Sequence, residues 1–441
     1  MALGRHFTWG ASTSAYQIEG ATGPEYGRGP SIWEKYFEDR PHLDHGAVAC
    51  GHYERMREDV QMMKRMGLTA YRFSIAWPRV MPDGHGRVNE QGLAFYDSLI
   101  DELLANGIEP YVTLYHWDLP LALSGENGGW TNRHTCQYFA DYAALCVKRY
   151  GDRVKNWATF NELEVIVAGY IGDGLAPGLS NPALRVQVGH NLLVAHGLAL
   201  RAMRAINSEI KIGIVLNLVP VEPANDSKEA ALAARSLWER GYAWYLDGLF
   251  KARYPDVVLA EAQASGVVFE PGDMALISQS IDMLGVNWYL RLVVDEKGAV
   301  VPVPGATVTQ MGWEINASAL SRMLIGMGKE YKGLLPPIYI TENGAAIDDV
   351  VGEDGHVHDP VRTTYIYDHL CALEKARRKG LDIRGYFAWS LMDNLEWSLG
   401  FAKTFGIVHV DRSTLKRTVK DSGRWYAHMI ARDRGLKAPK F

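Results

Sequence analysis

Eight short apolar segments, each followed by a stretch with helical character, constrain the fold of this chain more than any other sequence feature. The segments are rich in β-branched and aromatic residues, and they lie at 7–13, 70–77, 109–117, 154–162, 211–219, 283–290, 337–344 and 383–391. Strands that alternate with helices are typical of a parallel sheet, because each helix carries the chain back to the start of the next strand. Eight such units predict an α/β fold that closes into a (β/α)8 TIM barrel.

The segments between the predicted strands agree with this fold. Amphipathic stretches at 53–67 and 91–107 end in glycine, as helix C-termini often do, and the longest helical stretch runs over 186–209. The alternative is an open doubly wound sheet, but no GxGxxG motif follows the first strand, which disfavours its nucleotide-binding form. The chain has 441 residues, a size that α/β barrels reach as one unit, so we expect residues 1–441 to form a single domain.

Four segments that carry Gly and Pro are predicted to be long loops that follow strands. They lie at 22–50, 171–182, 296–312 and 348–360. In a barrel of this type the loops that leave the carboxyl ends of the strands build the active-site face. We therefore expect substrate contacts from these loops and from the strand ends beside them.

Charge and cysteine usage exclude several classes of partner and of location. The net charge is −5 without a dense run of Lys or Arg, so nucleic acid and anionic membranes are poor candidates. No stretch approaches ~18 consecutive apolar residues, and the start of the chain lacks the apolar core of a signal peptide. The four cysteines form no CxxC pair, and we expect free thiols in the cytoplasm.

Two glutamates end apolar strands in similar polar surroundings. Glu162 ends the fourth predicted strand in TFNE, and Glu342 ends the seventh in ITEN. Both strands line one small barrel, so the two side chains can converge at its mouth although 342 − 162 = 180 residues separate them. A protonated carboxyl that donates to a leaving oxygen and an ionised one that faces the anomeric carbon are the minimal equipment for glycosidic bond cleavage. The alternative is that each glutamate pairs with an arginine and only supports the barrel.

Two other classes of barrel enzyme fit the sequence poorly. A Schiff-base lyase needs a lysine at a strand end inside the barrel, whereas Lys155 and Lys211 lie at strand starts. A metal-dependent hydrolase would use clustered His and Asp at strand ends, and the HExxH motif is absent. We therefore expect no metal and no cofactor.

Several blocks of the sequence resemble one known family. TFNE and ITENG are similar to the two signatures of glycoside hydrolase family 1, the β-glucosidase-like retaining enzymes. The resemblance spans nearly the whole chain and includes FTWGASTSAYQIEGA, YRFSIAWPRVMP, YVTLYHWDLP, GGWTNR, GYFAWSLMDNLEWSLGF and FGIVHVD. It implies a (β/α)8 barrel, in agreement with the strand count. It also implies a β-glucosidase that removes terminal non-reducing β-D-glucosyl residues from β-glucosides and short cello-oligosaccharides through a covalent glycosyl-enzyme.

The resemblance assigns roles to five residues. Glu162 would be the general acid/base and Glu342 the nucleophile, with carboxyls about 5–5.5 Å apart, a spacing that predicts retention at the anomeric carbon. The acid would need a pKa raised to roughly 6, obtained by partial burial and by the nearby nucleophile. Arg72 would hold Glu342 ionised, and Tyr289 would hydrogen-bond to it. Asn161 would donate to the sugar 2-hydroxyl.

The resemblance also implies a pocket for the glycone, the sugar that is transferred. The matching positions are Gln17, His116, Trp117, Trp389, Glu396 and Trp397. A carboxylate such as Glu396 can accept hydrogen bonds from two adjacent hydroxyls, and a Trp face can stack against the C–H surface of a sugar ring. A carboxylate at O6 would repel a 6-phosphate, so we expect a small neutral β-glycoside as substrate.

Other readings remain open at this stage. A β-galactosidase, a β-fucosidase or a transglycosylating enzyme would share the same residues. A non-catalytic sugar-binding relative would be a different class; such proteins typically lose one carboxylate, whereas both are present here. The sequence does not indicate the preferred aglycone, which is the leaving group of the substrate, or the oligomeric state.

The clearest departure from the family pattern follows the predicted acid. Leu163 and Glu164 occupy positions where the family usually has Pro and often an aromatic residue. Our hypothesis is that Glu164 faces the aglycone side or the base of a neighbouring loop, where its charge would raise the pKa of Glu162. The alternative is a solvent-facing or salt-bridged loop residue. Replacing Glu164 with Gln removes its charge, and it should lower the limb of the pH–rate profile that reports ionisation of the acid, Glu162.

Three further positions depart from the pattern. Gly51 and Glu54 replace Asp and His that are common in the family, and Thr404 replaces a frequent Arg. These changes leave both predicted catalytic carboxyls intact. They bear on the aglycone-side loops, on stability and on oligomer contacts.

Overall fold

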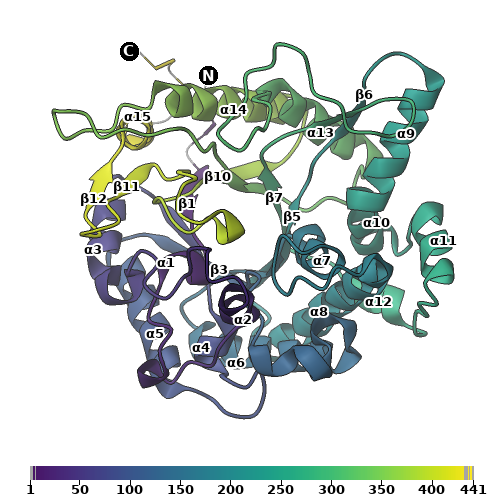
Figure 1. Ribbon diagram of the computed structural model, residues 1–441, viewed down its shortest axis with the longest axis horizontal. Coiled ribbons are helices and arrows are strands. Elements are labelled where there is room, and N and C mark those ends of the chain that lie inside the picture. The colour runs from purple at the N-terminus through teal and green to yellow at the C-terminus, as the bar shows by residue number, and fades with distance from the viewer. Residues whose placement is uncertain (1–2, 5, 432–435, 437, 440–441) are drawn as a thin grey trace.

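Eight parallel strands form a closed barrel at the centre of the molecule (Figure 1). The computed structural model describes residues 3–4, 6–431, 436 and 438–439. The barrel strands are β1 (Thr8–Ser12), β2 (Ala70–Ser74), β3 (Glu109–Tyr115), β4 (Asn156–Asn161), β5 (Lys211–Asn217), β7 (Met283–Trp288), β9 (Ile338–Asn343) and β10 (Ile383–Trp389). They pair in this order, and β10 closes the barrel against β1. Each strand lies within a predicted segment, and the predicted fold class is confirmed.

Helices surround the barrel (Figure 1). The long ones are α3 (His52–Arg65), α5 (Glu90–Ala105), α6 (Arg133–Tyr150), α8 (Arg185–Ile206), α13 (Ala317–Glu330) and α14 (Pro360–Arg378). The shorter ones are α1 (Ala15–Ile18), α2 (Ile32–Glu38), α4 (Trp77–Val80), α7 (Leu163–Ile171), α9 (Lys228–Trp238), α10 (Trp244–Lys251), α11 (Asp256–Ala264), α12 (Asp273–Ile277) and α15 (Asp421–Ala431). A π-helical turn at Glu239–Ala243 joins α9 to α10.

Two small sheets lie outside the barrel. One pairs β6 (Val221–Pro223) with β8 (Leu292–Val294) in parallel, and the other pairs β11 (Val408–Val410) with β12 (Arg417–Val419) in antiparallel orientation. The first joins the segments that follow β5 and β7, and the second follows β10. Both therefore stabilise connections that lead away from barrel strands.

Alternation along the strands explains how polar residues reach the barrel interior. An inner apolar cluster consists of Ala70, Tyr111, Met283, Tyr339 and Phe387. Their strand neighbours, such as Tyr71 and Val112, belong to the larger core between the strands and the helices. Because side chains alternate with a period of two, Arg72 lies on the same side of β2 as Ala70, nearer the carboxyl end. The interior thus changes from apolar to polar toward the end where the loops leave.

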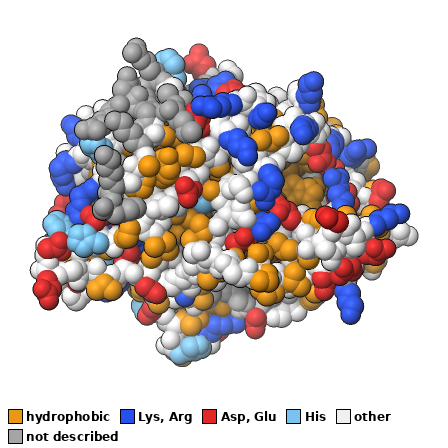
Figure 2. Space-filling model, turned by 90° about the horizontal axis from the view of Figure 1, so that it is seen from above, with side chains coloured by type: hydrophobic (Ala, Val, Ile, Leu, Met, Phe, Trp, Pro, Cys, Tyr) orange, Lys and Arg blue, Asp and Glu red, His pale blue; other side chains and the backbone are white. Residues whose placement is uncertain are grey.

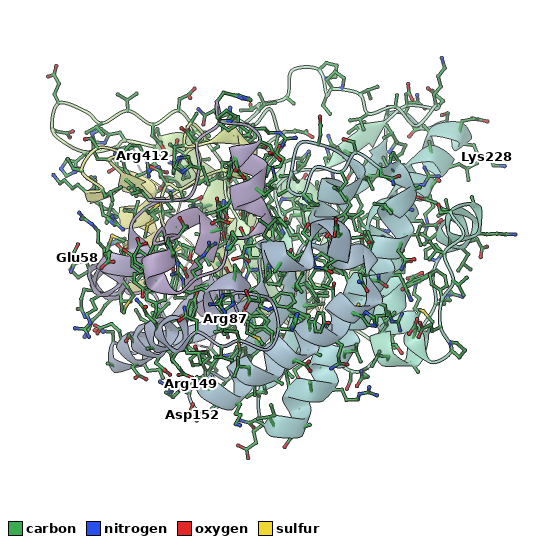
Figure 3. All side chains as sticks on the ribbon, turned by 60° about the horizontal axis from the view of Figure 1, so that its bottom comes forward. Glu58, Arg87, Arg149, Asp152, Lys228 and Arg412 are labelled. Carbon is green, nitrogen blue, oxygen red and sulfur yellow. The ribbon has the colours of Figure 1, made fainter. Side chains whose placement is uncertain are left out.

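Charged side chains lie mainly on the outside of the molecule. Figure 3 labels exposed examples, among them Glu58, Arg87, Arg149 and Lys228. On the face drawn in Figure 2, basic and acidic side chains are interspersed. Within the described part of the chain, no helix has the length and apolarity needed to cross a membrane.

Candidate active site

The two predicted carboxyls come from β4 and β9 and are both buried. Glu342 lies within β9, and its side chain is buried. Glu162 lies one residue beyond β4, where it caps α7, rather than within the strand end as predicted. Its φ of 55° is in the left-handed region, which is strained for a residue with a side chain. A hydrogen bond of 2.9 Å from its backbone N–H to Val215 O holds it against β5.

Glu342 is held by a cation and a hydroxyl. Arg72 Nη1 lies 2.6 Å from Glu342 Oε1, and the Tyr289 hydroxyl donates to Glu342 Oε2 over 2.6 Å. Arg72 also donates to Thr113 Oγ1 and to Asn161 Oδ1. Residues of three other strands, β3, β4 and β9, thereby fix the guanidinium in the barrel interior, and it neutralises the charge that Glu342 would carry.

Asn287 links the two catalytic candidates and was not identified from the sequence. Its Nδ2 donates to Glu162 Oε1 over 2.7 Å and to Asn161 Oδ1 over 3.0 Å. The Thr341 hydroxyl donates to Asn287 Oδ1 and fixes the orientation of the amide. The only sequence signal is a polar residue inside the apolar segment MLGVNWYL, two positions before Tyr289.

The predicted residues after β3 contact Asn161, the last residue of β4. Asn161 Nδ2 lies 3.1 Å from His116 Nε2, and Trp117 Nε1 donates to the backbone O of Asn161. Burial and the nearby Arg72 charge lower the pKa of His116 well below its ordinary value. His116 is therefore neutral, with Nε2 as the acceptor and the proton on Nδ1.

The environments of the two carboxyls give them different proton affinities. Burial, followed by the charge of Glu342 and then that of Glu164, raises the pKa of Glu162 well above its ordinary value. Burial also raises the pKa of Glu342, but Arg72 and the Tyr289 hydroxyl oppose that shift. As pH rises, Glu342 loses its proton first, and Glu162 still holds one. This is the pairing that an acid and a nucleophile require.

Aromatic rings from the end of β10 and from the loops after β3 and β10 form one wall beside the carboxyls. The His116 and Trp389 rings stack with centroids 5.9 Å apart, and His116 and Trp397 stack at 6.1 Å. Trp117 and Trp397 are 4.8 Å apart, and both have positive φ. The predicted residues that follow β3 and β10 thus meet in space.

Polar groups at this wall come from α1 and from the loop after β10. Gln17 Nε2 donates to Leu395 O over 2.7 Å, and Gln17 Oε1 accepts from Ser14 Oγ. This contact ties α1 to the loop that carries Glu396. Burial and then the charge of Glu342 raise the pKa of Glu396 to about 8.

The departures from the family pattern have identifiable contacts. Glu164 lies in the first turn of α7, and its Oε1 accepts from the backbone N–H of Asn217 over 2.9 Å. Thr404 Oγ1 donates to Ile347 O, so it anchors the loop after β9. Gly51 caps α3 with a φ of 62°, and Glu54 is an exposed acceptor for the Tyr26 hydroxyl.

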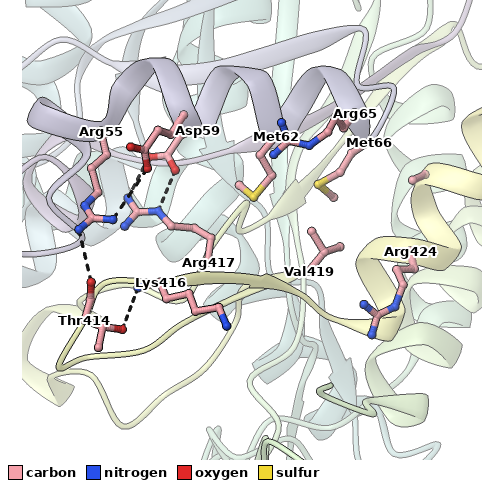
Figure 4. A pocket seen from close by; sticks show the side chains of 12 residues that line it. Arg55, Asp59, Met62, Arg65, Met66, Thr414, Lys416, Arg417, Val419 and Arg424 are labelled. Carbon is pink, nitrogen blue, oxygen red and sulfur yellow. Dashed lines mark hydrogen bonds and ion pairs between the residues drawn. The ribbon is translucent and has the colours of Figure 1, made fainter. Parts of the chain in front are cut away.

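A cavity of about 670 Å³ lies outside the barrel, between α3, β12 and α15 (Figure 4). Basic side chains, including Arg65, Lys416 and Arg424, surround an apolar floor that contains Met62. Figure 4 shows Arg417 and Asp59 paired across it. Among the residues described, its lining includes none of those predicted for the sugar site.

Known proteins with similar sequences and structures share one family. The model described as "Glycosyl hydrolase family 1" matches residues 1–435. Beta-glucosidase A of Thermotoga maritima is 43% identical over 441 residues, which cover 98% of this chain and 98% of that protein.

Solved structures agree with the sequence comparison. A Thermotoga maritima beta-glucosidase in complex with glucoimidazole has a TM-score of 0.94 at 42% identity, over 98% of this chain and 99% of that chain. The psychrophilic beta-glucosidase BglU of Micrococcus antarcticus also has a TM-score of 0.94 at 42% identity, with coverage of 99% and 98%.

Proposed function

Because this chain belongs to glycosyl hydrolase family 1, it is a glycoside hydrolase that acts on β-glucosides, and we propose that it works by double displacement through Glu162 and Glu342. One observation carries the proposal. A single buried network of Arg72, Asn161, Asn287 and the two carboxyls favours ionised Glu342 and protonated Glu162.

In the first step Glu342 attacks the anomeric carbon and Glu162 gives its proton to the leaving oxygen. The C1–O bond to the aglycone breaks as the bond from C1 to Glu342 forms. Arg72 and Tyr289 orient the attacking carboxylate and oppose its protonation. Asn161, which Arg72 and Asn287 fix, would donate to the sugar 2-hydroxyl, a contact that can strengthen in the transition state.

In the second step Glu162 acts as a base. Once Glu342 is an ester it carries no charge, so one of the causes that raise the pKa of Glu162 is gone. The ionised Glu162 then accepts a proton from water, the water oxygen bonds to C1, and Glu342 leaves as a carboxylate. The two inversions at C1 give net retention.

The glycone would bind against the aromatic wall, with Gln17, His116 and Glu396 as hydrogen-bonding partners. The wall offers ring faces to the C–H surface of a sugar, and Glu396 offers an oxygen pair to adjacent hydroxyls. A carboxyl group at this position disfavours a 6-phosphate. A neutral β-glucoside, as small molecule or short cello-oligosaccharide, is the substrate that these groups suit.

The mechanism is tested by stereochemistry and by one substitution. Proton NMR of the first product released from an aryl β-glucoside should show β-glucose before mutarotation, and release of the α-anomer would overturn double displacement. Glu342→Gly should lose about 10⁴-fold or more in kcat/KM, whereas a variant near wild-type activity would remove Glu342 from the mechanism. The same assay on aryl β-galactosides and β-fucosides ranks the alternative glycones.

A further inference from the structure

Glu164 is a third glutamate near the catalytic pair, and the proposed mechanism does not use it. It is two residues beyond Glu162, in the first turn of α7, and its side chain is half-buried. Its Oε1 accepts from the backbone N–H of Asn217 at the end of β5. Its Oε2 is buried and, within the described part of the chain, has no hydrogen-bond partner. The contact that holds this carboxyl is thus to a neutral group.

Among the described groups that interact with the Glu164 charge, none is a cation. They are Glu162, which caps α7, Glu342 on β9, and two tyrosines whose pKa this charge raises, Tyr242 of the π-helical turn and Tyr245 of α10. The guanidinium of the site, Arg72, is already shared between Glu342 and Asn161. A charge on Glu164 would therefore act mainly on the neighbouring carboxyls.

The carboxyls of Glu162 and Glu164, at the start of α7, influence each other's ionisation. Burial raises the pKa of Glu164 to about 8, opposed by backbone N–H groups, and burial together with the charges of Glu342 and Glu164 raises the pKa of Glu162 well above its ordinary value. As the pH rises past about 8, Glu164 gains a negative charge. The new negative charge on Glu164 then opposes loss of the proton from Glu162.

We propose that Glu164 is a positioning residue that keeps the leaving-group proton on Glu162 as the pH rises, and so extends activity toward alkaline pH. This inference rests on the proposed function of Glu162 as the acid. Glu162 would donate the proton to the leaving group, and Glu164, two residues further along, would keep that proton in place at alkaline pH. The position is one at which the sequence departs from the pattern of its family.

The test compares the pH dependence of kcat/KM in the wild-type enzyme and in Glu164→Gln, with an aryl β-glucoside as substrate. Glutamine keeps the shape and the acceptor for Asn217 N–H but cannot ionise. The alkaline limb should move to lower pH by about half a unit or more, while kcat/KM at the plateau stays within about threefold. Glu54→Gln, which removes an exposed carboxylate of α3, is the matched control and should leave the limb in place.

A purely structural Glu164 would give a different result. Glu164→Gln would then lower kcat/KM by the same factor at every pH, and an unmoved limb would overturn the inference. Glu164→Asp provides a second check, because it retains an ionisable group and should keep the limb above that of the glutamine variant.

The failure of this inference is separable from the failure of the proposed function. Glu162→Gln should abolish cleavage of cellobiose, whose leaving group needs a proton. Full activity of that variant would remove Glu162 as the acid. An inactive Glu162→Gln together with an unmoved limb in Glu164→Gln would reject the role of Glu164 alone.

Discussion

At the scale of single residues, one side-chain type takes several roles because its surroundings differ. The Glu342 carboxyl bonds a guanidinium and a hydroxyl, whereas in the described part of the chain the Glu162 carboxyl accepts a hydrogen bond from an amide. Each is buried, so burial alone does not separate them. The hydrogen-bond partners decide which carboxyl is ionised, and they come from strands that are distant in sequence.

Asn287 offers a direct test of this arrangement. Its amide donates to Glu162 and lowers the pKa of that carboxyl, so Asn287→Ala should raise it further and move the alkaline limb of kcat/KM to higher pH. Loss of the hydrogen bond that orients the Glu162 carboxyl should also reduce kcat about 10–100-fold. Asn225→Ala, at an exposed amide that bonds Glu296, is the control. A limb that moves to lower pH would contradict the assignment.

The sequence predicted the ionisable members of the site but not the amide that connects them. Glu162 and Glu342 are carboxyls at the ends of apolar segments, and Arg72 was implied by the family resemblance. Asn287 has no such signature, since one Asn in an apolar strand is equally consistent with a structural role. The pKa values of Glu162 and Glu342 also depend on burial and on charges of residues distant in sequence, and neither can be predicted from a local sequence pattern.

Glu396 should control recognition of the sugar at C6. Glu396→Gln should reduce kcat/KM for an aryl β-glucoside about tenfold more than for the β-xyloside, which lacks the hydroxymethyl group. The comparison is internal to one variant, so general damage to the site lowers both values and leaves the ratio unchanged. An unchanged ratio would therefore place the glucose O6 elsewhere.

At the scale of elements, buried ion pairs fix the connections that carry the site. Arg79 of α4 donates to Glu19 beyond α1 over 2.8 Å and to the backbone O of Gly20, and Tyr96 of α5 donates to the same carboxylate. This joins the connections after β1 and β2, and Gln17 lies on the first of them. The pairing could not be predicted from sequence, because Arg79 and Glu19 are 60 positions apart.

Removal of one partner should reveal how strongly this pair fixes the connections. Arg79→Ala leaves the buried Glu19 carboxylate without its cation, so the free energy of unfolding should fall by about 3–5 kcal/mol. Urea unfolding followed by fluorescence measures the change. The exposed pair of Arg87 with Asp83 is the matched control, and Arg87→Ala should leave the free energy of unfolding nearly unchanged. Equal effects of both variants would refute the distinction.

The helices of the long connection from β5 to β7 were the least predictable from the sequence. It contains α9, α10, α11 and α12, of which α11 and α12 have 9 and 5 residues. Short helices have little periodicity to recognise and depend on tertiary packing for stability. The eight strands were predictable because each lies in a short segment rich in apolar, β-branched and aromatic residues. The helices of this connection are not.

At the scale of the whole molecule, the barrel closes through its first and last strands. Thr8 pairs with Gly385 and Ser12 with Trp389, so the pairing that completes the site joins distant parts of the chain. A barrel lacking this contact would have two open edges and no common mouth. We therefore propose that residues 1–441 act as one catalytic domain and unfold as one unit.

Gly10 lies at this closure and tests both parts of that proposal. A Cβ at Gly10 would lie 2.3 Å from a ring carbon of Phe387 and 3.0 Å from Ala70 O, atoms of the two strands that flank β1. Gly10→Ala should lower the free energy of unfolding by about 1–3 kcal/mol or more, because the buried ring has no room to move. Gly174→Ala, where a Cβ meets nothing within 4 Å, should leave it unchanged.

The number of transitions in the unfolding curve tests whether the whole chain unfolds as one unit. If closure binds the whole chain into one unit, calorimetry of Gly10→Ala should show a single transition at lower temperature, and activity should disappear over the same range. A second transition that stays at the wild-type temperature would mean that part of the chain folds independently of the closing strands. The proposed catalytic carboxyls, Glu162 just beyond β4 and Glu342 on β9, would then depend on only part of the molecule, contrary to the proposal.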